Sequence, residues 1–395
     1  MKSAATESMD KSSELFIDAL RGVAALMVLV AHGIMVALRG IYGSDVAAVP
    51  EGWHLLLSTL GFGGFWVWAF FVISGLCIQQ SVARSAQRGD FTWGGYLVAR
   101  VTRIYPLFLL GLALAVLGWW LTDVFTHKVT SFPWASFWGS LVMLQLFTNP
   151  FPSFAPSWSL TNEAIYYLVW PIGFVLAGGS SRRAVVGLML GTLGLTAVLA
   201  WCWKTMHGGS DDSLFIPCWG VSAQFVIWLS GAWLGATWAR LSAWVSFRCW
   251  LLAWCWLAVV WVLVAGLQYT ASRAAWFMAA SYLAIPGFVV LLAGSRHARL
   301  GTKETVQRLC VWLGLLSYPC YILHKPIMWV TDVLLATTLP GDLAAQPALR
   351  IALVIAVPLI LLVIAGPPLE RAVMAWRKRM LSPRPTLSAP LRKSA

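Results

Sequence analysis

Charged side chains are scarce in this sequence of 395 residues. Asp, Glu, Lys and Arg make up 11% of it, whereas A, V, I, L, M, F, W, Y and C make up 59%. A soluble domain usually carries about 25% charged residues, because polar groups must cover its surface. So few charges cannot cover a chain of this length in water, but they suffice if most of the surface faces lipid. The composition therefore excludes an ordinary soluble fold and predicts a membrane protein.

Familiar catalytic and metal-binding patterns are also missing. The sequence contains no HExxH, no P-loop, no G-x-S-x-G and no GxGxxG, and its 7 cysteines form no zinc-type spacing. We therefore expect no metal site and no permanently bound cofactor. Cys202 and Cys218 flank one loop and could pair if that loop lies outside the cell, although buried cysteines usually behave as small hydrophobic residues.

Long apolar runs dominate the chain instead. A spanning helix needs about 20 mostly apolar residues, and ten stretches fit: 17–38, 56–80, 100–121, 160–178, 184–203, 219–238, 249–267, 275–294, 309–331 and 348–369. A further stretch, 134–148, is short and bounded by Pro133 and Pro150, so we interpret it as interfacial or re-entrant. The sequence thus predicts an all-α, polytopic transmembrane helical bundle with about ten spans.

The basic residues set the orientation. The net charge of +13 could indicate a nucleic-acid partner, but the bases concentrate in alternate loops and in the C-terminal segment. Cytoplasmic loops of membrane proteins show this pattern, and their bases meet anionic lipid headgroups. Treating 134–148 as a full span would place Arg182 and Arg183 outside. We therefore expect both termini in the cytoplasm, no nucleic-acid partner, a membrane domain over 1–370 and a disordered basic cytoplasmic tail over 371–395.

Ionisable residues in the first span are candidates for function, because such groups are costly inside a membrane. Arg21 and His32 are eleven residues apart, close to three helical turns, so they share one face about 16 Å apart along the axis. Arg21 could instead reach the headgroups beside Asp18, and His32 could simply make a helix–helix hydrogen bond. The functional interpretation is a neutral buried imidazole that accepts a proton.

Polar residues recur in four later segments. Ser74 lies in the second span, where small residues permit close helix contact. Arg100 and Arg103 enter the third span at i, i+3 and would suit a phosphate, although positive-inside anchoring also explains them. Glu163 lies about one turn into the fourth span, where the helix dipole favours a carboxylate. The remaining candidates, from the fourth and ninth spans, are Trp158, Asn162, Tyr166, Tyr321 and His324.

Five motifs occur in an order that resembles the acyltransferase-3 family of bacterial integral membrane acyltransferases. They are IDALRGVAALMVLVAHG, AFFVISGLCI, RVTRIYP, PSWSLTNEAIYYL and SYPCYILHKPI. The resemblance extends from about residue 15 to residue 371. It implies a multi-pass protein of the bacterial inner membrane that moves an acyl group, commonly acetyl, from cytoplasmic acyl-CoA to a hydroxyl of a sugar, glycan or lipid-linked sugar acceptor.

The resemblance also implies roles for single residues. The family's Arg-x10-His pair corresponds here to Arg21 and His32, and its Arg-x-x-Arg pair corresponds to Arg100 and Arg103. The Glu of the family motif matched by PSWSLTNEAIYYL corresponds to Glu163. The family's histidine near the C-terminal end corresponds to His324. Asn162 stands where the family usually has Val. On this basis we expect His32 and Glu163 to be catalytic. We expect Arg21, Arg100, Arg103 and Ser74 to bind acyl-CoA. The residues that we expect to face the acceptor or to support the site are Asp18, Trp158, Asn162, Tyr166, Tyr321 and His324.

Two other functions fit the same pattern. A transporter or flippase of a lipid-linked sugar or a small solute would also need polar residues in its spans and a cavity near the midplane. A non-catalytic assembly protein would tolerate substitution of Arg21 and His32. Binding of acyl-CoA separates the acyltransferase from both.

Overall fold

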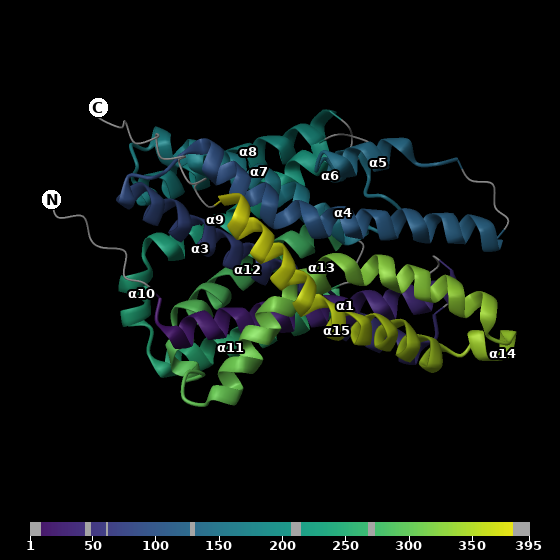
Figure 1. Ribbon diagram of the computed structural model, residues 1–395. Helices are drawn as coiled ribbons and strands as arrows, with labels where there is room; N and C mark the ends of the chain where they lie inside the picture. The colour runs from purple at the N-terminus through teal and green to yellow at the C-terminus, as the bar shows by residue number, and fades with distance from the viewer. Residues whose placement is uncertain are drawn as a thin grey trace, which may run out of the picture.

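The computed structural model describes residues 9–43, 49–60, 62–126, 131–206, 215–267 and 273–381 (Figure 1). Across these ranges the chain is helical and has no strand, which confirms the all-α prediction. Each predicted span overlaps one long helix, but the predicted span 56–80 begins in the short helix α2 (Glu51–Leu60) and reaches its long helix only at Gly64. The long helices are α1 (Lys11–Tyr42), α3 (Gly64–Arg88), α4 (Trp93–Thr126), α7 (Trp158–Leu176), α8 (Ser181–Met206), α9 (Phe215–Ala236), α11 (Phe247–Leu267), α12 (Arg273–Ala293), α13 (Glu304–Thr338) and α15 (Pro347–Leu381).

Among the described residues, 7 of these helices are long and apolar enough to cross a membrane: α1, α3, α4, α8, α11, α13 and α15. The helices that are not among the ten long ones are short. They are α2 (Glu51–Leu60), α5 (Trp134–Leu141), α6 (Gln145–Thr148), α10 (Trp238–Trp244) and α14 (Gly341–Ala344), with 3-10 turns at Ala155–Ser157 and Ser295–Ala298. The 8 residues of α5 extend only about 12 Å at 1.5 Å per residue. The stretch 134–148 therefore does not span the membrane, as predicted.

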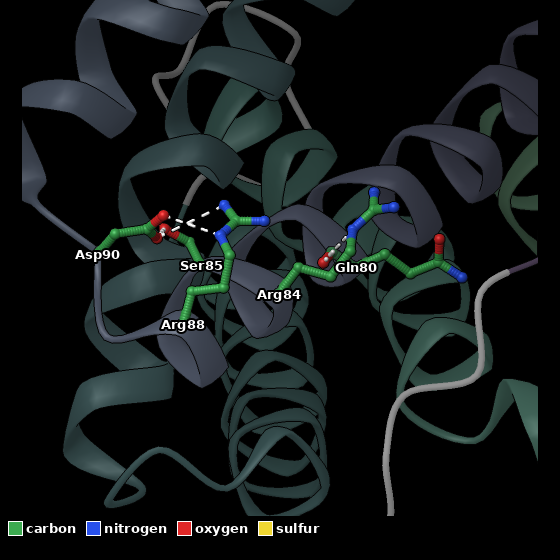
Figure 2. Close-up of polar contacts among 5 residues, drawn as sticks. All are labelled: Gln80, Arg84, Ser85, Arg88 and Asp90. Atoms are coloured by element: carbon green, nitrogen blue, oxygen red, sulfur yellow. Dashed lines mark hydrogen bonds and ion pairs between the residues drawn. The ribbon is translucent and has the colours of Figure 1, made fainter. Parts of the chain in front are cut away.

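The end of α3 shows how the sequence stops a helix at the membrane surface (Figure 2). Gly89 follows the helix in the left-handed conformation, with φ of 72°, which glycine adopts without strain. Asp90 then accepts hydrogen bonds from Arg88 Nε at 2.8 Å and Ser85 Oγ at 2.5 Å. The hydrogen bonds from Arg88 and Ser85 lower the pKa of the Asp90 carboxyl, so this contact persists at neutral pH. Arg84 instead donates to a backbone carbonyl one turn earlier.

Two helix pairs make the most extensive contacts of the bundle, α1 with α13 and α3 with α9. In the second pair the backbones touch. A Cβ atom built on Gly75 would lie 2.0 Å from the carbonyl oxygen of Trp228, and one on Gly231 would lie 1.9 Å from that of Val72. Small residues permit such close approach between membrane helices. The two glycines therefore fix the spacing of α3 and α9.

The ends of the bundle agree with an even number of crossings. α1 begins and α15 ends at the same end, and α14 lies at the opposite end (Figure 1). Near α14, Arg350 of α15 donates to Asp332 of α13 at 2.7 Å, and Arg350 is only 7% exposed. α15 continues to Leu381 rather than ending near 370, so the first part of the predicted tail is helical; residues 382–395 lie outside the described residues. The thiols of Cys202 and Cys218 are both free, so the disulfide considered above is absent.

Candidate functional site

A cavity of about 190 Å³ lies between α1, α3, α4, α7 and α13. It brings together six of the residues predicted from sequence: Arg21, Ser74, Arg100, Arg103, Glu163 and Tyr321. Its apolar wall comes mainly from α3. Five separate helices thus contribute to one interior space. The residues that we predicted to bind acyl-CoA line it together with the carboxylate that we predicted to be catalytic.

Arginine side chains form one end of this cavity, where α4 begins. The guanidinium of Arg100 lies 5.2 Å from the centre of the Tyr96 ring. The guanidinium of Arg103 lies 4.9 Å from the centre of the Tyr318 ring and forms an ion pair with Glu370 of α15. Aromatic faces and a buried carboxylate therefore hold both groups in place.

Arg21 approaches the same end from α1. Its nearest acidic partner is Asp18, with 3.9 Å between Nη1 and Oδ1, which is too long for a hydrogen bond. Asp18 itself packs against Gly314 of α13 and does not line the cavity. Arg21 is thus the least engaged of the three guanidinium groups that face the cavity.

Glu163 is oriented by a directed chain of hydrogen bonds. Its Oε2 accepts from the Tyr167 hydroxyl at 2.7 Å. Tyr167 Oη lies 3.2 Å from Ser74 Oγ, and Trp228 Nε1 donates to Ser74 Oγ at 3.1 Å. The single hydroxyl hydrogen of Tyr167 goes to Glu163, so Ser74 is the donor to Tyr167. Ser74 therefore supports the carboxylate through Tyr167.

Two histidines meet further along α1, about three turns from Arg21. His324 Nε2 lies 3.1 Å from His32 Nδ1. His324 Nδ1 lies 2.8 Å from the Cys320 carbonyl oxygen, so it carries a proton, and Nε2 of the neutral ring is an acceptor. His32 Nδ1 lies 3.0 Å from the Val28 carbonyl oxygen and is therefore the donor to both neighbours. This pattern leaves Nε2 of His32 without a proton, as a base requires.

The side chains of Phe70 and Tyr321 lie between the cavity and the histidines. Both line the cavity, and neither histidine is among its described lining residues. The two rings are 5.1 Å apart between centroids, and the Tyr321 ring is 6.4 Å from that of His324. The Tyr321 hydroxyl is 2.6 Å from Ser159 Oγ. Arg21 and His32 thus lie about three turns apart on α1, and of the two only Arg21 lines the cavity; the Tyr321 ring lies between them at the end of the cavity that is nearest to His324.

The other candidates on α7 serve packing. Asn162 Nδ2 donates to Gln224 of α9 at 3.0 Å, and the Tyr166 hydroxyl donates to the Val221 carbonyl at 2.7 Å. Trp158 packs edge-on against Phe71 and does not line the cavity. The cause is helical spacing, because Ser159, Glu163 and Tyr167 recur every four residues on the cavity face while Asn162 and Tyr166 face α9.

Sequence reasoning missed three residues that shape the site. Tyr167 could have been found from its i, i+4 spacing to Glu163. Glu370 is an acidic residue within a basic stretch, which is a weak signal. Phe70 carries no signal, because an aromatic residue in an apolar run is ordinary.

Residues 14–366 match the family described as an acyltransferase domain. This chain belongs to the acyltransferase-3 family. Family membership and the apolar helices make it a multi-pass membrane protein. This acyltransferase-3 protein is also similar to "Protein 2 in picA locus" of Rhizobium radiobacter, at 30% identity over 100 residues, which is 25% of this chain. The aligned part covers 42% of that relative, and no solved structure matches the chain.

Proposed function

We propose that this acyltransferase-3 protein moves an acyl group, with acetyl as the simplest case, from cytoplasmic acyl-CoA to a hydroxyl of a glycan or lipid-linked sugar. The observation that carries the proposal is the cavity itself. It has guanidinium groups at one end, a hydrogen-bonded carboxylate on its wall, and a neutral histidine pair behind its aromatic end.

The arginine end supports a phosphate-bearing donor. Arg100 and Arg103 belong to the first three turns of α4, and α4 begins at the end of the bundle where α1 begins (Figure 1). The basic loops predict this end to be cytoplasmic, and acyl-CoA is a cytoplasmic metabolite. Guanidinium groups bind phosphate through paired N–H donors. Arg21 extends the positive charge into the cavity.

The size of the cavity fits only the narrow part of such a donor. Its 190 Å³ is below the roughly 300–1,000 Å³ of sites that enclose a drug-sized ligand. The pantetheine arm and a short acyl group would occupy it, while the nucleotide would stay at the arginine end. The thioester would then reach the region of Glu163 and the Phe70–Tyr321 pair.

The chemistry follows from the histidine tautomers. The acceptor hydroxyl oxygen attacks the thioester carbonyl carbon while Nε2 of His32 takes the hydroxyl proton. The C–S bond then breaks, and the proton passes from His32 to the departing thiolate, which gives the ester and free CoA. His324 accepts from Nδ1 of His32 and so keeps the base nitrogen free. Glu163 orients the acceptor hydroxyl, and Phe70 and Tyr321 must move aside for the thioester to reach His32.

Transfer in membranes tests the proposal. Membranes that contain the protein should move label from acetyl-CoA to glycan, and His32→Ala should lose this transfer by about 100-fold or more. His297→Ala is the matched control, because the His297 ring contacts the Val245 carbonyl, Phe247 and Trp250 and does not line the cavity. Full transfer by His32→Ala at equal protein level would discard the role of His32. A purified protein that moves lipid-linked sugar but does not bind acyl-CoA would favour a flippase.

A further inference from the structure

The C-terminal part of α15, beyond the predicted span 348–369, carries polar residues whose hydrogen-bonding atoms are not all paired. Glu370 has a side chain that is only 3% exposed, and its Oε1 pairs with Arg103. Its Oε2, the Nε of Arg100 and the Nε of Arg377 are buried and have no hydrogen-bond partner among the described residues. Buried polar atoms are normally satisfied, so three such atoms in one place indicate a site built for a polar ligand.

These residues form one charged cluster. Arg377 interacts electrostatically with Arg100, Arg103 and Glu370, and the two arginines repel it while Glu370 attracts it. Three guanidinium groups and one carboxylate leave an excess of positive charge in a half-buried place. α15 packs against α4, so the cluster joins the C-terminal helix to the helix that carries both cavity arginines.

We propose that Arg377 is a third arm of the phosphate-binding end of the cavity. Glu370 occupies Arg103 while the site is empty and yields it to a phosphate when the ligand arrives. The ligand chemistry is a phosphate ester or diphosphate with more than one negative charge, because a single charge would leave the cluster positive. This inference rests on the proposed function, in which the phosphates belong to the acyl donor; a phospholipid headgroup is the alternative source.

The exposure of Arg377 differs from that of Arg379, and this difference distinguishes a phosphate site from a general attraction to lipid. The sequence pattern assigned 371–395 to a basic tail that only follows the positive-inside rule. In the structure Arg377 is half-buried, whereas Arg379 in the same last turns is exposed. A general attraction to anionic lipid treats both arginines alike, but a built phosphate site needs only Arg377.

Binding of CoA and its fragments tests the proposal. The full-length protein, purified in nanodiscs of zwitterionic lipid, is titrated with CoA, dephospho-CoA and pantetheine, which has no phosphate. Arg377→Gln should weaken CoA binding on the order of tenfold and leave pantetheine binding unchanged. Arg379→Gln removes the same charge and should change CoA affinity by less than about twofold. Arg377→Lys, which keeps the charge but loses the planar fork, should lie between the wild type and Arg377→Gln.

Several results would overturn it. Equal CoA affinity in Arg377→Gln and wild type would remove Arg377 from the site and leave the proposed function intact. An equal loss for CoA and pantetheine would show a structural role. If Arg377→Gln lowers the preference of the protein for anionic over zwitterionic lipid in the nanodisc and leaves the CoA affinity unchanged, the cluster binds lipid. If the wild type binds none of the three CoA compounds, both this inference and the proposed donor fail.

Discussion

His32 is held as a base by its neighbours rather than by an acidic residue. The Val28 carbonyl and His324 both accept from its Nδ1. We expect His324→Leu to lower transfer by roughly tenfold, because the Val28 carbonyl alone then keeps the proton on Nδ1 of His32 and away from the base nitrogen. His324→Gln should retain more activity, since its amide oxygen can still accept from Nδ1. Initial rates with labelled acetyl-CoA measure both, and equal loss in the two variants would contradict the tautomer assignment.

The hydroxyl of Tyr167 is the last donor in the chain that reaches Glu163. Tyr167→Phe removes the hydrogen bonds of the hydroxyl to Glu163 and to Ser74 but keeps the ring, so we expect transfer to fall by roughly tenfold. Glu163→Gln should cost more, because it removes the carboxylate itself. Tyr282→Phe is the control, since its hydroxyl donates to the Ala223 carbonyl and Tyr282 does not line the cavity. A Tyr167→Phe enzyme as active as the control variant would show that the chain does not orient Glu163.

Single residues were predicted from sequence only where chemistry marked them. Arg100, Arg103 and Glu163 stood out because charge is costly in a membrane, and the structure places all three around one cavity. The contact of His32 with His324 could not be predicted, because it joins two helices far apart in sequence. Asn162 looked like a site residue by proximity to Glu163, but one residue along a helix turns the side chain by 100° to another partner.

At the scale of elements, the crossing of α3 and α9 sets a strict size limit. Gly231→Ala places a methyl group against the Val72 carbonyl, so we expect a loss of about 1–3 kcal/mol or more, seen as a lower melting temperature in detergent. Gly220→Ala in the same helix is the control, because nothing lies within 4 Å of a Cβ atom there. Equal stability of the two variants would contradict the close crossing.

The ion pair between α13 and α15 is the second test at this scale. Arg350 and Asp332 have side chains that are 8% and 17% exposed. Asp332→Asn leaves a buried guanidinium unpaired and should cost about 3 kcal/mol. Glu304→Gln breaks the exposed pair with Arg308 and should cost about 0–1 kcal/mol. Thermal unfolding in detergent compares them, and a similar shift in both would show that the inner pair is solvated.

Elements were easier to predict than contacts. Apolar runs gave the ten long helices because a spanning helix must satisfy its own backbone. Their ends were less certain, since α13 and α15 extend well beyond the apolar part of each run. The extension of α15 put Glu370 and Arg377 beside α4, a placement that hydropathy cannot indicate.

At the scale of the molecule, Cys77 reports both orientation and occupancy. Cys77 is exposed and lines the cavity, so a reagent that enters the cavity can reach its thiol. In a variant with Cys77 as the sole cysteine, we expect a membrane-impermeant maleimide to label inverted vesicles but not right-side-out cells. Added CoA should slow the labelling severalfold. Labelling from the outside alone would reverse the predicted orientation.

The two tightest helix pairs lie on different walls of the cavity, since Arg21 and Tyr321 come from α1 and α13 while Ser74 and Phe70 come from α3. Glycine contacts lock each pair internally, so neither pair can part without losing backbone contact. Any widening that admits a bulky substrate would therefore separate the pairs from each other, or from α4 and α7, and would not open either pair; the boundary between the two pairs is the seam of the cavity. Phe70 and Tyr321 face each other across that seam. A small rotation of one helix pair against the other would therefore change the contact between these two rings first.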